Sequence, residues 1–487
     1  MEYEVILASV KNHNQPRDIQ EDTMDNRKFN TFADNMVEQH KIPGTMIAIQ
    51  KDGVDTFKKG FGYRDVDQKR EVSSQTVFGI GSITKSMTCA AILQLQEAGK
   101  LSVHDSVLAY LPEFQTPDPT RTKQMTIHHF MTHSSGIPPL PTLFYANKKS
   151  IEAEGSMEQY EAMGIKWDEE KGSIETNEDL IAFLAAQDYR LLGEPGQYMS
   201  YSNDAYALLG IIIERVSGQT YADYLIEHLF KPLGMKNTFF SPDTLKNKNE
   251  VTLLYTPEMH GDKVEMAASS LWWDAPPMYA SGYVKSTAED MLHYGDLFSN
   301  HHPQILSEKS IHSMMFPHIQ MQPGVYYGYG WMVSPDYFGT TLIEHSGGIK
   351  GASASFAILP DKNIKGVCLT NVAGAPANPM LMGGLNMVSE REAEEHYLSY
   401  EDYEPSKTER QSMLGIYSSQ EGIKVEIKEG DDQLIVALSG AEIPARSVGP
   451  FQLTIPFQSQ VISIEGIRTD HEIDRIHFAG RQLTRDE

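Results

Sequence analysis

The sequence predicts an α+β fold followed by a small antiparallel β-barrel. Up to about residue 390, segments with strand-like and with helix-like apolar spacing are mixed along the chain. From residue 408 onward, apolar residues instead recur at every second position, as they do in strands with one buried face. The length of 487 residues allows about three domains, or two if one is large.

The first part contains a predicted hairpin and a predicted long helix. Residues 44–50 and 56–63 are expected to be strands joined by the turn at 51–53. Residues 82–98 carry an apolar face and end at Gly99, which is typical of a helix. Two more helices and three more strands are expected, the helices at 204–216 and 221–230 and the strands at 340–344, 352–359 and 364–370.

Composition and apolar spacing divide the chain into four expected segments: a polar leader (1–28), a large globular domain (29–390), a linker (391–407) and an antiparallel barrel (408–487). The last segment resembles a lipocalin barrel. The charged stretch 390–404 is typical of a linker helix or a tether. Residues 150–180 hold ten acidic side chains against two lysines. That imbalance indicates a surface insertion, either a flap or a solvated excursion.

Charge and cysteine content exclude several classes of function. With 41 basic and 66 acidic residues the formal charge is −25, so nucleic acids and anionic membrane surfaces would be repelled. Cys89 and Cys368 lie in apolar runs and are expected to be buried core residues, not a disulfide framework. The apolar stretch at 5–8 is shorter than a signal-peptide core. We therefore expect a cytoplasmic protein with no nucleic-acid and no membrane partner.

Searches for several common catalytic motifs are negative. The sequence has no G-x-S-x-G elbow and no Walker-type phosphate loop. His128, His129 and His133 are close in sequence, but no carboxylate or thiolate pattern joins them, so no metal site is expected.

One pair of residues has the spacing that nucleophilic catalysis needs. Ser82 is the only serine with a lysine, Lys85, three positions later. On a helix such residues are neighbours on one face. A serine hydroxyl needs a nearby group to take its proton, and a lysine with a depressed pKa can be that group. The start of a helix also favours a developing anion. The alternative is a helix-capping serine followed by a solvated lysine.

Two later motifs accompany this pair. Tyr201 and Asn203 form a Tyr-x-Asn motif between a Pro-Gly turn and a predicted helix. His345 and Gly347 follow at the end of a predicted strand. A second Tyr-x-Asn at 145–147 lacks both the turn and the apolar helix, so Tyr201 is preferred.

This order of motifs resembles the serine β-lactamase-like and penicillin-binding protein family, which contains class C β-lactamases, D-alanyl-D-alanine carboxypeptidases, D-aminopeptidases and esterases. The similarity covers residues 29–390, with matching phrases at 78–85, 126–136, 232–238, 286–290 and 359–363. It implies a β-lactamase-like domain, in which an antiparallel sheet flanked by helices adjoins an all-helical region.

The resemblance also implies roles for the residues. Ser82 would attack a carbonyl and form an acyl-enzyme, while Lys85 and Tyr201 share the proton transfer. The remaining residues would serve the substrate and the oxyanion, namely Asn203, His345, Gly347 and Gly348, with the backbone N–H groups of Ser82 and Gly348 as oxyanion donors. No metal or organic cofactor is implied.

One residue departs from the β-lactamase pattern. His345 stands where β-lactamases of this group usually carry lysine, and an imidazole is largely neutral near pH 7. Anchoring of a substrate carboxylate should therefore be weak, which resembles D-aminopeptidases and esterases more than true β-lactamases.

Three functions remain open at this stage. The first is a serine peptidase, amidase or esterase that acts through Ser82 on a small-molecule or short-peptide substrate. The second is a penicillin-binding or sensor protein with slow or no deacylation, or a β-lactamase. The third is a silent scaffold with 408–487 as its interaction module, which the intact catalytic positions disfavour. A homo-oligomer is compatible with the sequence. Three aromatic residues are equally compatible with a pocket wall and with the core, namely Trp272, Trp273 and Tyr279.

Overall fold

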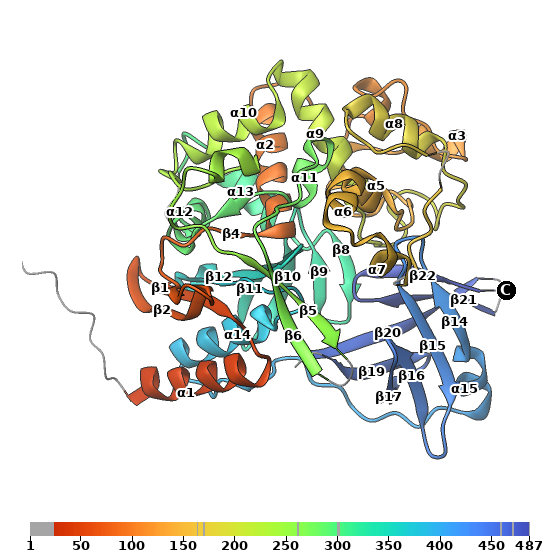
Figure 1. The fold of residues 1–487 in the computed structure, drawn as a ribbon. Coiled ribbons are helices and arrows are strands. Elements are labelled where there is room, and N and C mark those ends of the chain that lie inside the picture. The colour runs from red at the N-terminus through yellow and green to blue at the C-terminus, as the bar shows by residue number, and fades with distance from the viewer. Residues whose placement is uncertain are drawn as a thin grey trace, which may run out of the picture.

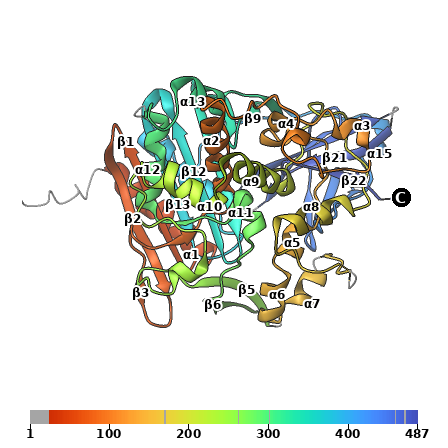
Figure 2. The same ribbon diagram turned by 90° about the horizontal axis from the view of Figure 1, so that it is seen from above.

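The computed structural model describes residues 24–162, 164–168, 171–260, 263–299, 302–457, 460–469 and 472–486. A large antiparallel sheet with helices on both faces adjoins a helical region, and a second sheet follows at the C-terminal end (Figure 1). In both Figure 1 and Figure 2 this second sheet lies at the end of the molecule opposite to the hairpin of β1 and β2. The α+β prediction is confirmed.

The large sheet has nine antiparallel strands. Their order is β3 (Arg70–Glu71), β2 (Val54–Asp65), β1 (Gly44–Lys51), β13 (Ile364–Thr370), β12 (Ala352–Leu359), β11 (Thr340–Ile349), β10 (Met332–Tyr337), β9 (Val325–Tyr327) and β8 (Ile319–Gln322). The predicted hairpin is confirmed, with Lys51 paired to Val54 and positive φ at Asp52 and Gly53. Every residue of β12 and β13 is buried, including polar ones such as Ser355 and Lys365, because helices cover both faces of the sheet here.

Helices cover both faces of the large sheet. On one face, α1 (Met24–Gln39) and α14 (Ala377–Val388) share a core with β1 and β13. On the other face lie α2 (Thr84–Glu97) and α12 (Ala288–Ser299). Because α1 begins at Met24, the last residues of the expected leader 1–28 are helical. Residues 1–23 lie outside the described residues.

The three predicted helices are confirmed, with small differences at their ends. A 3₁₀ turn, Gly81–Ile83, precedes α2. Helix α9 (Asn203–Ser217) follows the capping residue Ser202, and α10 (Tyr221–Leu225) continues as a π-helical turn. The other helices are α3 (Pro119–Thr122), α4 (Ile127–Met131), α5 (Thr142–Ala146), α6 (Lys148–Glu154), α7 (Met157–Ala162), α8 (Asn177–Ala185), α11 (Tyr279–Gly282) and α13 (Glu308–Met315). Two short ribbons pair β4 (Phe78–Gly79) with β7 (Lys285–Ser286) and β5 (Leu254–His260) with β6 (Lys263–Ser269).

The acidic segment 150–180 is not a solvated excursion. Three of its few aliphatic side chains, Ile151, Ile174 and Leu180, are buried in the main core. Glu154 also forms an ion pair with Lys350, and both side chains are nearly buried. Composition alone could not show this, because the acidic residues are numerous and only the few apolar ones face inward.

The C-terminal sheet is a nearly closed, barrel-like antiparallel sheet of nine strands. Its order is β17 (Ala441–Pro444), β16 (Leu434–Leu438), β15 (Lys424–Glu429), β14 (Gly415–Ser418), β22 (Arg481–Arg485), β21 (Glu472–Phe478), β20 (Gln460–Thr469), β19 (Gln452–Phe457) and β18 (Arg446–Gly449). A short helix, α15 (Lys407–Met413), precedes it. Its core is separate from that of the large sheet, as the period-two pattern predicts.

The charged stretch between the two sheets is a tether, not a helix. Residues 389–406, all of them described, contain no helix or strand. Tyr397 packs on Tyr337 and hydrogen-bonds Ser334, while Asp402 forms an ion pair with Arg446 of the barrel. The tether is therefore attached to the large sheet and to the barrel.

Cys89 and Cys368 are buried free thiols, as expected. Within the residues that the structure describes, no helix has both the length and the apolar character that a membrane span requires.

Candidate active site

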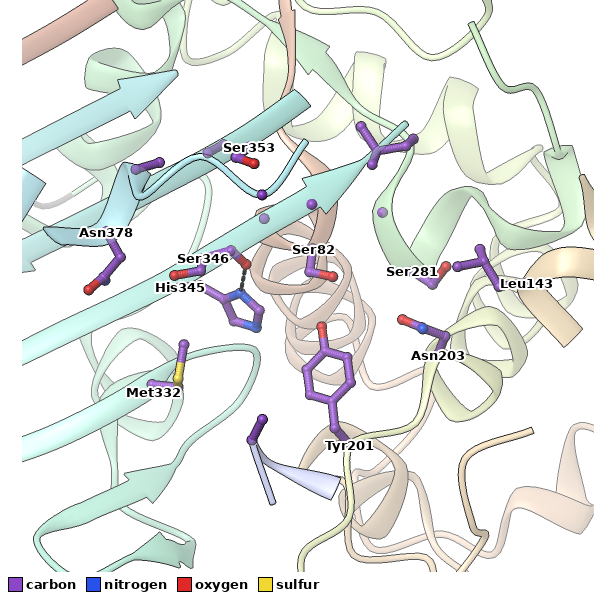
Figure 3. Close-up of a pocket in the computed structure, with 18 of the residues that line it drawn as sticks. Ser82, Leu143, Tyr201, Asn203, Ser281, Met332, His345, Ser346, Ser353 and Asn378 are labelled. Atoms are coloured by element: carbon purple, nitrogen blue, oxygen red, sulfur yellow. Dashed lines mark hydrogen bonds between the residues drawn. The ribbon is translucent and has the colours of Figure 1, made fainter. Parts of the chain in front are cut away.

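A cavity of about 490 Å³ lies where the large sheet, the helical region and the barrel meet. In Figure 3 the side chains of Ser82 and Tyr201 point toward each other. The predicted residues that line it are Ser82, Tyr201, Asn203, His345, Gly347 and Gly348. The remaining one, Lys85, is fully buried behind Ser82. The fold thus brings together residues that are as far as 266 positions apart in sequence.

Three oxygens surround the amine of Lys85. Its Nζ lies 3.2 Å from Ser82 Oγ, 2.8 Å from Asn203 Oδ1 and 2.5 Å from the carbonyl oxygen of Ser281. Burial, together with the positive charge of Arg481, holds the pKa of Lys85 well below its ordinary value. A lysine in this state can accept the serine proton.

The phenol of Tyr201 reaches the same serine. Its side chain hydrogen-bonds Ser82, and Lys85 Nζ lies 4.7 Å from the centre of its ring. Burial raises the pKa of Tyr201 above its ordinary value, while the Ser82 hydrogen bond and the charge of Arg481 act in the opposite direction. The resting side chain is therefore a neutral phenol that can donate a proton.

Glycines let the strand β11 touch the turn that carries Ser82. A Cβ at Gly347 would lie only 1.9 Å from the carbonyl oxygen of Ile80 and 3.2 Å from the backbone nitrogen of Ser82. A Cβ at Gly81 would lie 2.5 Å from the nitrogen of Gly348. Side chains are excluded at both places, so the backbones carrying the two expected oxyanion donors are neighbours.

His345 is buried and neutral. Its Nδ1 lies 2.6 Å from the carbonyl oxygen of Ser346 (Figure 3), so this nitrogen carries the hydrogen, and Nε2 accepts from the hydroxyl of Tyr327 at 3.0 Å. Burial, with the charge of Lys85, lowers the pKa of His345 to about 3. The cavity therefore has no lysine-like charge at this position.

His133 packs against Tyr201 in the site, a role that the amino-acid sequence does not indicate. Its ring lies 4.2 Å from that of Tyr201, and its Nδ1 accepts the backbone N–H of Ser202 at 3.0 Å. Of the two other histidines of this segment, His128 bonds Tyr329, and His129 bonds the backbone N–H of Thr126 at the helix cap. No cluster of three metal-binding side chains occurs among the residues that the structure describes.

The second Tyr-x-Asn motif lies outside the cavity. The hydroxyl of Tyr145 bonds the backbone at Lys166 and Asp168, and Asn147 bonds Tyr283. Of the three aromatic candidates, only Trp273 lines the cavity, whereas Trp272 and Tyr279 pack in the core.

The barrel supplies part of the wall, which sequence reasoning missed entirely. Gln460, Ala479 and Arg481 line the cavity beside the predicted residues. Their motif-free sequence gives no sign of this, because it depends on how the barrel docks.

A second cavity of about 720 Å³ continues from the first. The two share Met321, Met332, Ser346, Asn378, Gln460 and Ala479. Glu344 lines this second cavity. Its carboxylate accepts a hydrogen bond from the side-chain amide of Asn378, and burial raises the pKa of Glu344 to about 7. The combined space can hold a substrate that extends well beyond the reacting bond.

The raised pKa of Glu344 makes stability depend on pH. The contribution of Glu344 to the free energy of unfolding is fully present below its ordinary pKa of 4.5 and is lost as the pH rises through about 7. Glu344→Gln removes this loss, so the melting temperature of the variant relative to wild type should be higher at pH 8 than at pH 5. Thermal melts at both pH values measure the difference. An equal difference at both would contradict the burial of this carboxylate.

Comparison with known proteins agrees with this geometry. The Beta-lactamase family model matches residues 29–382. Protein flp of Staphylococcus aureus (strain MW2) is 28% identical over 347 residues, which are 71% of this chain and 63% of that protein, so the chain covers less than two thirds of this relative. Penicillin-binding protein 4* of Bacillus subtilis (strain 168) is 24% identical over 85% of this chain and 88% of its own length. The structure of the octameric penicillin-binding protein homologue from Pyrococcus abyssi has a TM-score of 0.68 at 27% identity and covers 94% of this chain and 100% of that chain. The chain therefore belongs to the Beta-lactamase family.

Proposed function

We propose that this chain is a serine hydrolase that cleaves an amide or ester bond through an acyl-enzyme on Ser82, as a D-aminopeptidase-like peptidase or an esterase. The observation that carries the proposal is the convergence of Lys85 Nζ and the Tyr201 phenol on Ser82 Oγ, at the edge of an accessible cavity. A structural serine would not need two proton-carrying groups at its hydroxyl.

In the acylation step, Ser82 Oγ attacks the substrate carbonyl carbon while its proton passes to the neutral amine of Lys85, which returns it to Tyr201 once that phenol has given its own proton to the leaving group. The charge that develops on the carbonyl oxygen is held by the backbone N–H groups of Ser82 and Gly348. When the intermediate collapses, the bond to the leaving nitrogen or oxygen breaks. Tyr201 donates a proton to the leaving amine or alcohol, and the acyl group stays on Ser82.

In the deacylation step, water attacks the acyl carbonyl and gives its proton to the same pair of side chains. The bond to Ser82 Oγ then breaks, Oγ regains a proton, and the carboxylic acid leaves. Asn203 serves both steps by holding Lys85 Nζ at 2.8 Å.

The neutral state of His345 supports the choice of substrate class. A substrate carboxylate at this position would meet an imidazole that bears no charge near pH 7. At this position, uncharged esters and peptides without a carboxylate next to the scissile bond fit better than a substrate that places a carboxylate beside His345.

A panel of three substrates tests the proposal. The protein is incubated with a p-nitrophenyl ester, a D-alanine p-nitroanilide and a penicillin, and product release is measured together with intact mass. Turnover of the ester or the anilide is the expected result. A stable penicillin adduct without turnover of either would instead support the second candidate, a penicillin-binding protein with slow deacylation, which the name of the Bacillus subtilis relative favours. Absence of both turnover and adduct would contradict the proposal.

A charge placed at position 345 should change substrate preference. His345→Lys adds a permanent positive charge, and a charge-assisted hydrogen bond to the penicillin carboxylate is worth roughly 1 kcal/mol more than a neutral one. The ratio of penicillin acylation to ester acylation should therefore rise roughly fivefold, even if both rates fall. The matched control His345→Gln removes the imidazole without adding charge. A ratio that is the same in both variants and in wild type would count against His345 as a substrate-facing residue.

We also propose a division into a catalytic domain (29–390), a linker (391–407) and a barrel (408–487), together with a homo-oligomeric assembly. The separate cores support the division. The octameric Pyrococcus abyssi homologue supports the assembly. Light scattering coupled to size-exclusion chromatography measures the number of copies, and a monomer would contradict it.

A further inference from the structure

Among the described residues that line the catalytic cavity, the only one with a formal charge comes from the barrel. Arg481 begins β22, directly after the two-residue turn formed by Ala479 and Gly480. Both turn residues have positive φ, 47° and 79°. An alanine rarely adopts this conformation, so the turn is held in a shape that places Arg481 at the cavity wall.

The turn is fixed to the segment that carries Tyr201. The backbone N–H of Tyr201 donates to the carbonyl oxygen of Gly480 at 2.8 Å. The backbone N–H of Gln482 donates to Ser200 Oγ, and its side chain donates to the carbonyl oxygen of Met199, both at 3.2 Å. Barrel and catalytic motif therefore keep a fixed relative position at this point.

The guanidinium of Arg481 faces the ring of Tyr201. Its Cζ lies 5.0 Å from the ring centre, within the range of a cation–π contact. Its Nε donates to Glu421 Oε2 at 2.7 Å, and the two side chains are only 23% and 9% exposed. The ion pair is thus shielded from solvent, where its charges act more strongly than at the surface.

We propose that Arg481 is a positioning residue for Tyr201, so that the C-terminal barrel completes the catalytic site, and that Glu421 moderates its charge. This inference rests on the proposed function, in which Tyr201 and Lys85 carry the serine proton. The guanidinium holds the phenol ring against Ser82 and favours the proton-accepting state of both groups.

Arg481 and Glu421 act on Lys85 and Tyr201 in opposite directions. A positive charge stabilises a phenolate and destabilises an ammonium, so Arg481 lowers the pKa of both Tyr201 and Lys85, whereas Glu421 raises both. The acid limb of a pH–rate profile follows deprotonation of the base. Removing Arg481 should move this limb to higher pH, and removing Glu421 should move it to lower pH.

The test measures how fast an alkyl fluorophosphonate phosphonylates Ser82 between pH 5 and 10. In this reaction the Ser82 oxygen–phosphorus bond forms, fluoride leaves, and the serine proton passes to the base. The probe is uncharged, so it does not depend on the natural substrate. We expect Arg481→Gln to shift the acid limb to higher pH by about one unit. Glu421→Gln should shift it to lower pH, and Arg481→Lys should restore most of the wild-type profile.

A control on the same strand separates this effect from a disturbed barrel. Arg485 is exposed on the barrel, with its Cζ 5.8 Å from the ring centre of Tyr417, and Arg485→Gln should leave the acid limb unchanged. Shifts of the same sign for Arg481→Gln and Glu421→Gln would overturn the proposal. The proposal would also be overturned if the acid limb stayed at the wild-type pH while only the turnover of carboxylate-bearing substrates fell. That result would make Arg481 a substrate anchor. If wild-type Ser82 is not labelled at all, the proposed function itself fails.

Discussion

Ser82→Ala is expected to abolish ester and amide turnover, with a loss of at least about a thousandfold. The change removes the one hydroxyl on which Lys85 Nζ and the Tyr201 phenol converge. Ser82 is partly exposed to the cavity, so the melting temperature should change little. Hydrolysis of a p-nitrophenyl ester measures the activity, and a thermal melt confirms the fold.

A matched control for this prediction lies in α2, four residues after Ser82. The hydroxyl of Ser86 donates to the carbonyl oxygen of Ile83 and accepts from Tyr294, and it does not line the cavity. Ser86→Ala should therefore lower stability while keeping activity. If Ser82→Ala keeps a substantial share of the wild-type rate, the nucleophile is another residue.

Tyr201→Phe should lower kcat on the order of a hundredfold or more, with a smaller effect on KM. The variant keeps the ring contacts with His133 and Arg481 but removes the phenol that hydrogen-bonds Ser82. Proton transfer is therefore lost while the cavity keeps its shape. Steady-state kinetics on one ester and one anilide measure the change.

Tyr145→Phe is the matched control, because Tyr145 belongs to the other Tyr-x-Asn motif. Its hydroxyl bonds the backbone at Lys166 and Asp168, away from the cavity. This variant should lose stability and keep its activity. If Tyr145→Phe were the more damaging change, the assignment of the motif would be reversed.

Much of the fold could be predicted because local spacing carries it. Period-two alternation identified the barrel strands, and the turn at 51–53 identified the hairpin. The strand β11 runs past its expected end at residue 344 to Ile349. Its last part contains Gly347 and Gly348, which have no side chain to continue the apolar pattern and which fit there because the Ser82 turn touches the strand.

The site shows the same division between local and distant information. Lys85 follows Ser82 by three residues, where the 3₁₀ turn passes into α2, so the sequence alone indicates their contact. The roles of His133 and Arg481 depend on docking between segments that are distant in the chain, and no spacing rule reports that. The sequence spacing of His133 suggests at most a metal ligand, whereas its ring packs on Tyr201.

The central claim is that Ser82 carries the acyl group, and covalent labelling tests it most directly. The protein is treated with an alkyl fluorophosphonate while esterase activity is followed, and the adduct is then located by peptide mass mapping. We expect one adduct per chain, on the peptide that contains Ser82, formed in parallel with the loss of activity and absent from Ser82→Ala. Loss of activity through modification of another residue, or full activity after complete modification of Ser82, would contradict this account.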